Sequence, residues 1–313
     1  MISRMQLILL LLLTILSAPA GASEEVVVLF PPDLTLATDP VIKVYAFRVG
    51  KAGDPVPVRV NGQDAEPLRG EVFLSGEIAL TPGRNELDVG GRTVRVYDLP
   101  GSRMDRYRLP EVDGKEPVVF RAYRIHPALE DGCEGCHSVA GGGKLTVAMD
   151  QKRSCYECHD DFEKGEGEEK RHVHGPVQAG ECTSCHDPHY ASRPKLSKLE
   201  KGCYECHDPF PEDGTVHRPV KTGECTACHG PHTGAAPKML LRAGNALCLG
   251  CHETPHATHR SAEVKGRSTQ VPPDFPREKD ELVCTGCHFP HRSPERRLFR
   301  MPQGKLCQMC HPL

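Results

Sequence analysis

The sequence predicts a two-domain protein, with a small all-β domain at its N-terminus followed by a mostly irregular domain of short helices. Residues 24–98 contain no Cys or His, whereas all 16 cysteines lie from Cys133 onward. The chain also has no Trp, only 5% aromatic residues, 30 Gly and 28 Pro. Such a composition gives the second domain too little apolar area to offset chain entropy, so we expect its core to come from another source.

The first residues have the features of a secretory signal peptide. Arg4 precedes the apolar run Leu7–Leu16, and Ala20-Gly-Ala22 provides an A-x-A cleavage site. The run is too short to cross a bilayer, so we expect export without a membrane span, with cleavage after Ala22 or, alternatively, after Ala20. The predicted boundaries are a signal peptide over 1–22, the β-domain over 23–99, a linker over 100–117 and the second domain over 118–313.

The β-domain is predicted from short apolar or alternating runs separated by turn residues. The turn residues are Asn61-Gly62, Pro82-Gly83 and Gly90-Gly91, and Asn-Gly between Val-rich strands suits a tight hairpin. The runs are Val26–Phe30, Val41–Phe47, Val56–Val60, Val72–Leu74, Ile78–Leu80, Glu86–Val89 and Thr93–Tyr97. This pattern, with VRVNGQ followed by LTPGRNELDV, resembles the immunoglobulin-like modules of bacterial surface and periplasmic proteins. The resemblance implies an Ig-like sandwich that serves docking or spacing.

Eight CxxCH motifs account for every cysteine of the chain. CxxCH is the attachment signature of c-type haem, in which two thiols bond to the haem vinyl groups and the adjacent histidine binds the iron. Zinc sites and redox disulfides also use CxxC pairs, but neither requires the histidine. We number the motifs 1 to 8 in chain order; their cysteines are Cys133 and Cys136, Cys155 and Cys158, Cys182 and Cys185, Cys203 and Cys206, Cys225 and Cys228, Cys248 and Cys251, Cys284 and Cys287, and Cys307 and Cys310. The predicted cofactor is eight covalently attached haem c groups, which would form the core of the second domain.

The motifs recur within an internal repeat. One unit runs from Cys155 to CTSCHDPH, the next from Cys203 to CTACHGPH, and a looser third from Cys248 to CTGCHFPH. Residues 125–311 thereby resemble the multihaem cytochromes with a doubled CxxCH motif. The resemblance implies electron transfer through stacked, mostly bis-histidine haems. In this division, motif 1 is the second half of a truncated unit and motif 8 is a first half without its partner.

The 17 histidines nearly match the ligands that eight six-coordinate irons need. The proximal ligands are predicted to be His137, His159, His186, His207, His229, His252, His288 and His311. The distal candidates are His126, His174, His189, His217, His232, His259 and His291 at repeating positions, with His172 and His256 competing for the eighth site. Residues three apart face the same way on a helical turn, so His232 cannot share an iron with His229 and is expected to serve a neighbouring haem. The eighth site also stays open to Met149, Met239, Met301, another molecule or no ligand, and motif 8 is the suspected open haem.

These features favour an exported electron-transfer protein without catalytic residues. The histidine supply nearly saturates the irons, and no CxxCK motif occurs. The alternatives are a subunit of an extracellular cytochrome filament or porin–cytochrome conduit, and a multihaem reductase with one open haem. A formal charge of −3, made more negative by haem propionates, disfavours nucleic-acid binding. The expected partners are redox proteins, other multihaem cytochromes, an outer-membrane porin or further copies of the chain, in the periplasm or at the cell surface.

Overall fold

A computed structural model describes residues 25–49, 53–109, 117–140, 144–147, 149–164, 171–253, 271–278 and 281–311. The chain divides into two compact units. Unit 1 is Met1–Asp150 with His186–Lys198, and unit 2 is Gln151–Cys185 with Leu199–Leu313. The expected signal peptide, and the candidate ligands His256 and His259, lie outside the described residues.

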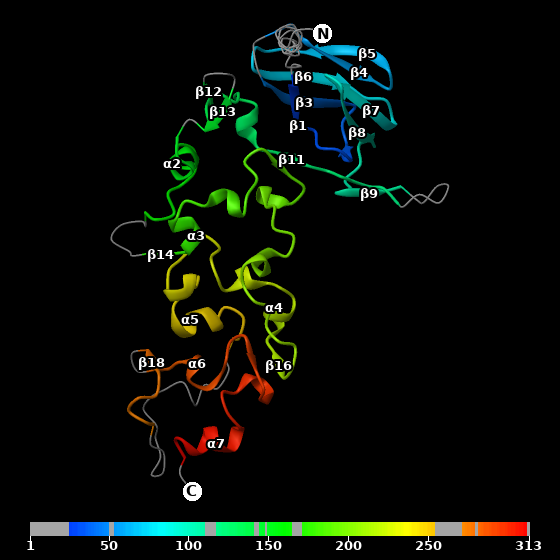
Figure 1. The fold of residues 1–313 in the computed structure, drawn as a ribbon. Helices are drawn as coiled ribbons and strands as arrows, with labels where there is room; N and C mark the ends of the chain where they lie inside the picture. Colours follow the sequence, from blue (N-terminus) through cyan, green and yellow to red (C-terminus); the bar gives the residue numbers. More distant parts are fainter. Residues whose placement is uncertain are drawn as a thin grey trace, which may run out of the picture. The chain divides into compact units, whose positions relative to one another are not determined.

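Two β-sheets form most of unit 1 (Figure 1). The smaller sheet is antiparallel, in the order β1 (Glu25–Phe30), β3 (Val41–Val49) and β6 (Phe73–Ala79). The larger sheet has the order β5 (Gln63–Leu68), β4 (Val56–Val60), β7 (Gly83–Val89), β8 (Arg92–Asp98), β2 (Thr35–Ala37), β10 (Val119–Arg121) and β9 (Arg106–Arg108). Five of the seven predicted apolar runs lie within a strand, and the other two, Val72–Leu74 and Ile78–Leu80, both overlap β6.

The predicted tight turns have the backbone conformations that their residues favour. Asn61 and Gly62 connect β4 to β5 with φ values of 53° and 81°. Gly90 and Gly91 connect β7 to β8 with φ values of 56° and 84°. Two successive positive φ values match the right-handed twist of the flanking strands, and Asn and Gly tolerate them best.

One hydrophobic cluster joins the two sheets. Val44 and Leu74 from the smaller sheet belong to the same buried cluster as Val58 and Leu87 from the larger one. The inward residues alternate along the strands, which is the period that a half-buried strand imposes. Leu129, which lies just before motif 1, is 8% exposed and belongs to this cluster as well. The polypeptide that carries motif 1 is therefore packed onto the β-domain.

The cysteine-rich residues form only short elements. Those of unit 1 are β11 (Arg124–Ile125), η1 (Pro127–Leu129), β12 (His137–Ala140), β13 (Lys144–Val147), β15 (Tyr190–Ala191) and η3 (Pro194–Leu196). Those of unit 2 are α2 (Gln151–Tyr156), β14 (His172–Val173), α3 (Gly175–Gln178), η2 (Cys182–Ser184), η4 (Gly202–Glu205), β16 (Thr215–Val216), α4 (Arg218–Lys221), η5 (Cys225–Ala227), β17 (Thr233–Gly234), η6 (Pro237–Met239), α5 (Gly244–Cys248), β18 (Arg277–Glu278), β19 (Glu281–Leu282), α6 (Cys284–Cys287), β20 (Arg292–Ser293), η8 (Arg296–Leu298) and α7 (Gln303–Gln308). Short helical turns separated by loops were predicted for this part of the chain. Among the described helices, none is long and apolar enough to cross a membrane.

Candidate haem-binding sites

A single helical turn places the three attachment residues of each motif. The backbone N–H of His137 donates to the Cys133 carbonyl at 2.9 Å, and the corresponding bond recurs in motifs 2 and 4 to 8 at 2.9–3.0 Å. This turn brings the two cysteines, three residues apart, to the same side of the chain. None of the 16 cysteines is joined to another by a disulfide bond. Both sulfurs of a motif can therefore reach one porphyrin edge.

The thiols of consecutive motifs lie close together in unit 2. Burial raises the pKa of the Cys203 thiol, and the neighbouring thiols of Cys225 and Cys185 raise it further. Burial likewise raises the pKa of Cys248 to about 11, with contributions from Cys284 and Cys228. From motif 3 to motif 7, each motif therefore has a thiol close to a thiol of the next motif. In the haem-bound protein the sulfurs are thioethers that do not titrate, so what remains is the adjacency of the attachment points.

Motif 8 continues this series. Burial raises the pKa of the Cys287 thiol, and the thiols of Cys310, Cys284 and Cys307 raise it further. On the preceding side, Asn245 of α5 accepts a hydrogen bond from the Cys284 backbone N–H at 2.9 Å and donates one to the Leu282 carbonyl at 2.9 Å. Asn245 is only 6% exposed. Its amide therefore fixes the helix that leads into motif 6 against the start of motif 7.

Four proximal histidines each face one distal candidate. The ring centres are 5.9 Å apart for His137 and His189, 6.0 Å for His174 and His207, 6.1 Å for His217 and His252, and 5.9 Å for His229 and His291. The ring planes of these pairs are inclined by 18° to 34°. Two imidazoles on opposite sides of one metal, each bonded at about 2 Å, would hold their ring centres about 6 Å apart. The spacing of all four pairs therefore leaves room for one iron between the rings.

Three short antiparallel β-ribbons each bring two of the distal candidates together. The ribbons are β11 with β15, β14 with β17, and β16 with β20. At the end of each, one histidine N–H donates to another histidine's carbonyl: His126 to His189 at 2.7 Å, His174 to His232 at 2.9 Å, and His217 to His291 at 2.9 Å. In the third ribbon, His217 faces the proximal histidine of motif 6 and His291 faces that of motif 5. One ribbon thus presents candidate ligands to two different motifs.

The sequence explains why these histidines stand where they do. His126, His174 and His217 are the N-cap residues of η1, α3 and α4. Their backbones are extended, with φ of −68°, −66° and −63°. A proline in the first helical turn follows each of them. Proline is favoured at this position because its missing N–H has no intrahelical partner to lose. The histidine is therefore held between the end of a strand and the start of the helix leading to the next motif.

Three proximal histidines are oriented by a carbonyl nine residues further on. The ring Nδ1 of His186 lies 2.8 Å from the Lys195 carbonyl oxygen, that of His229 lies 2.9 Å from Lys238, and that of His288 lies 2.9 Å from Arg297. A carbonyl only accepts hydrogen bonds, so Nδ1 is the donor and Nε2 keeps the lone pair that a metal needs.

These carbonyl-donating residues were missed by the sequence analysis. Lys195, Lys238 and Arg297 are left-handed, with φ of 56°, 62° and 56°, and the residue after each is left-handed too. The sequence carried one signal for these residues. In all three cases a basic residue followed by Leu or Met stands at the same distance after CHxPH.

Burial keeps two distal candidates in the form that binds a metal. Burial lowers the pKa of His189, with further lowering by His137 and His126 partly opposed by Asp187. Burial also lowers the pKa of His291, followed by the effects of His229, Lys238 and His217. A lowered histidine pKa favours the neutral imidazole at pH 7, and only the neutral ring can donate electrons to iron.

The remaining candidates have different settings. His172 lies in β14 opposite Gly234, at a position held by Arg124 and Thr215 in the other two ribbons, so it stands outside the repeat. Met239 ends η6 with a left-handed φ of 54°.

The donor set of a motif and its facing histidine fits haem c: two thiols and an imidazole lie within one turn, with a second imidazole on the far side.

Comparison with known proteins identifies the repeat. The family model described as the doubled CXXCH motif matches residues 126–164, 174–212, 217–263 and 275–312, which together make up just over half of the chain. No curated protein and no solved structure matches the chain. The four matches place motifs 1 and 2 in one copy and motifs 7 and 8 in another. The expected truncated units at the two ends are therefore wrong, because the expectation started the repeat one motif out of phase.

Each matched copy joins two attachment motifs, in which the cysteines bind haem c covalently and the histidine binds its iron. The structure adds a second histidine opposite four of the proximal ones. The chain belongs to the doubled CXXCH motif family and is a multihaem c-type cytochrome.

Proposed function

We propose that the protein is an exported octahaem cytochrome that conducts electrons through closely packed, mostly bis-histidine haems. The observation that carries the proposal is the set of four facing histidine pairs, each with ring centres about 6 Å apart. An iron with imidazole on both faces has no free position for a substrate. Such an iron can gain or lose an electron without changing its ligands.

The residues around the haems have separable tasks in this function. The cysteines fix each porphyrin to the chain, and the proximal and distal histidines hold the iron in one coordination geometry. Lys195, Lys238 and Arg297 orient three proximal rings through their carbonyls. The haem supplies the one-electron iron chemistry. Because the attachment points of motifs 3 to 8 are adjacent, the haems of these six motifs would form a continuous series.

The proposed partners are redox proteins, including other multihaem cytochromes, an outer-membrane porin or further copies of this chain. The Arg4 and Leu7–Leu16 segment supports export, to the periplasm or to the cell surface. The two sheets with their shared core support an Ig-like sandwich as the N-terminal domain.

The test combines a haem count by mass spectrometry with electron paramagnetic resonance (EPR) of the oxidised protein. We expect eight haems and only low-spin ferric signals. The variant His217→Ala removes the ring that faces His252, so about one haem in eight should become high-spin. The matched control is Thr215→Ala, on the same ribbon, which should leave all signals low-spin.

A high-spin signal from one whole haem in the unaltered protein would contradict a fully closed conduit. Small oxyanions would then be added to the reduced protein to measure reductase turnover. A low-spin spectrum in His217→Ala would show that His217 is not a ligand.

A further inference from the structure

Motif 1 differs from the motifs that share its position in the matched copies, which are motifs 3, 5 and 7. In those three, the proximal ring donates its Nδ1 hydrogen to a backbone carbonyl. The Nδ1 of His137 is buried and has no hydrogen-bond partner among the residues that the structure describes. The loop that supplies the carbonyl elsewhere is replaced here by the hairpin of β12 and β13, in which His137 pairs with Val147.

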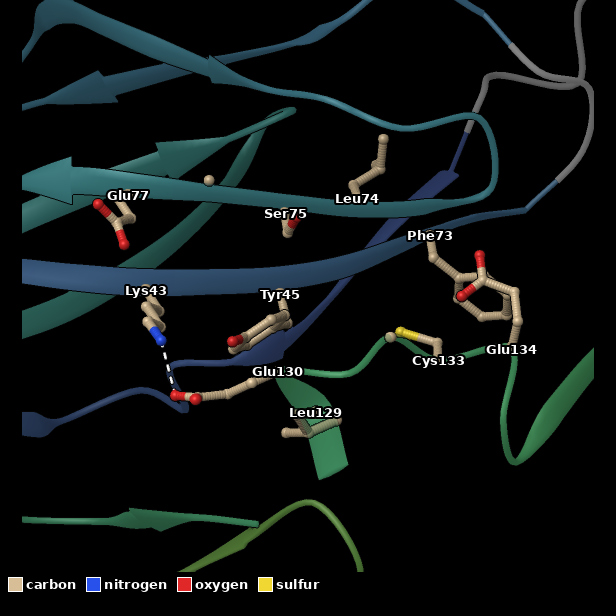
Figure 2. A pocket seen from close by; sticks show the side chains of 12 residues that line it. Lys43, Tyr45, Phe73, Leu74, Ser75, Glu77, Leu129, Glu130, Cys133 and Glu134 are labelled. Carbon is tan, nitrogen blue, oxygen red and sulfur yellow. Dashed lines mark hydrogen bonds and ion pairs between the residues drawn. The ribbon is translucent and has the colours of Figure 1, made fainter. Parts of the chain in front are cut away.

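The β-domain provides the surroundings of motif 1 instead. A cavity of about 330 Å³ lies between the β3–β6 face and the chain around Cys133, within the size range of small-molecule sites. Figure 2 shows the Cys133 sulfur pointing into the space between Tyr45 and Phe73. Burial raises the pKa of this thiol, with smaller contributions from Glu134 and Cys136. The attachment atom of the first haem thus already lies against the sheet.

Two further contacts fix this arrangement. The Phe73 ring centre is 6.5 Å from that of His137, so the sheet reaches the proximal imidazole. On the opposite side of the cavity, Lys43 of β3 donates to a Glu130 carboxylate oxygen at 2.6 Å (Figure 2). Leu129 beside it is 8% exposed and packed in the core of the β-domain. The wall facing motif 1 is therefore part of a rigid sheet.

The missing Nδ1 hydrogen bond and the neighbouring Phe73 ring act on the iron in the same direction. A hydrogen bond from Nδ1 makes imidazole a stronger electron donor, which stabilises ferric iron. Without that bond, the ferric state of the first haem loses stabilisation that motifs 3, 5 and 7 retain. A ferric haem carries one more positive charge than a ferrous one, and the apolar ring of Phe73 beside His137 keeps water away from that charge and so disfavours it. Ligand hydrogen bonding and burial are two of the means by which a protein sets haem potential.

We infer that the N-terminal β-domain forms one wall of the first haem's site and holds this haem at a higher reduction potential than the haem of motif 5. An electron reaching this haem from a neighbouring ferrous haem leaves that neighbour ferric and makes the first haem ferrous. At equilibrium, electrons therefore collect beside the β-domain. This inference rests on the proposed function, because it takes His189 as the distal ligand opposite His137.

The test first assigns two EPR signals and then follows them during a redox titration. His189→Ala should abolish the low-spin signal of motif 1, and His291→Ala, at the repeat-equivalent position, should abolish that of motif 5. In the unaltered protein, the signal assigned to motif 1 should disappear at the higher potential. We expect about a tenfold difference in the ferric–ferrous equilibrium, which is ~59 mV for one electron. Equal potentials, or the opposite order, would overturn the inference.

A second set of variants tests the wall itself. Phe73→Ala should shift the motif 1 signal to a lower potential and leave the motif 5 signal unchanged. Tyr97→Ala is the matched control, because it removes an aromatic ring that packs against Tyr107 and Phe120 in the larger sheet. An unchanged motif 1 potential in Phe73→Ala refutes the role of the wall. If His189→Ala abolishes no low-spin signal, the proposed ligation fails at that haem, which is a different result from equal potentials.

Discussion

The β-domain and unit 2 obtain their cores in different ways. The β-domain buries large aliphatic side chains from both of its sheets in one cluster, including Val44, Leu68, Leu87, Val89 and Val96 at 0% exposure. In the part of unit 2 that the structure describes, the buried hydrophobic residues are Ala236, Phe275 and Leu306. A stable fold must bury enough apolar area to offset the loss of chain entropy. The β-domain does so with side chains, and unit 2 requires haem.

The secondary structure of unit 2 agrees with this reading. Its longest helices, α2 and α7, have six residues, and the strands of its ribbons have two. Isolated helices of fewer than about 12 residues are marginal in water. The helices α2, α5 and α7 each contain the first cysteine of a motif at or next to their last residue. A covalent cofactor can therefore hold short segments that would not be stable as free peptide.

The largest expected effect is that of withholding haem. Protein produced without haem attachment should lose its folded structure throughout unit 2, whereas the β-domain should stay folded. Limited proteolysis with mass spectrometry would then yield a protected fragment that contains β1 to β8. A protected fragment from within residues 199–311 of the haem-free protein would contradict the comparison, because it would reveal a core made by the polypeptide alone.

A smaller effect is expected from a cavity in the β-domain core. Leu87→Ala removes a side chain with 0% exposure and should cost about 2–5 kcal/mol of β-domain stability. Amide hydrogen exchange of the sheet strands would measure this loss, and the low-spin EPR signals of motifs 4 to 8 should not change. Val41→Ala, at a position that is 47% exposed, is the control and should have little effect. Equal effects of the two substitutions would argue against a side-chain core.

The smallest effect concerns a buried carboxylate in the same domain. Asp98 is 1% exposed, and neither carboxylate oxygen has a hydrogen-bond partner. Burial raises its pKa, and the charge of Asp39 adds to the shift. A carboxyl whose pKa is raised in the folded state destabilises the fold when it ionises. This loss of stability is zero below the unfolded-state pKa, grows as the pH rises and reaches its full size above the folded-state pKa.

Asp98→Asn should therefore stabilise the β-domain by about 1 kcal/mol at pH 7, with the gain disappearing near pH 3.5. Urea denaturation at the two pH values, followed by amide exchange in β7 and β8, would measure it. The control is Asp64→Asn, because the Asp64 side chain is 88% exposed. A gain that is the same at both pH values would show that the charge of Asp98 is not its cause.

The sequence predicted most strands of the β-domain because their apolar residues alternate and their turns use Asn-Gly or Gly-Gly. It did not predict β2, β5, β9 or β10, and β9 lies within residues 100–117, which were expected to be a linker. The β5 segment QDAEPL has no apolar alternation, and β2 is a three-residue strand that lies parallel to β8. β2 is stabilised by pairing with β8, which is distant in sequence, whereas β5 is paired with β4 across the Asn61-Gly62 turn; neither strand has an apolar pattern that identifies it.

The attachment chemistry could be predicted from sequence alone, because two thiols and a histidine within one helical turn form a local pattern. The nine remaining histidines were identified as candidates by counting and by their repeat positions. Which of them faces which motif was not accessible in this way. His189 follows motif 3 in the chain, yet its ring lies 5.9 Å from the ring of His137 in motif 1.

The sequence by itself thus determined the haem chemistry, the hairpin turns and the set of candidate ligands, since each depends on residues that are close together in the chain. The tertiary structure decided the pairing of the histidines, because two-residue ribbons bring together segments from different copies of the repeat. It also decided that motif 1 lies against the β-domain. That placement depends on Leu129 and Phe73 being packed on one sheet face, and such long-range packing has no signature in the local sequence.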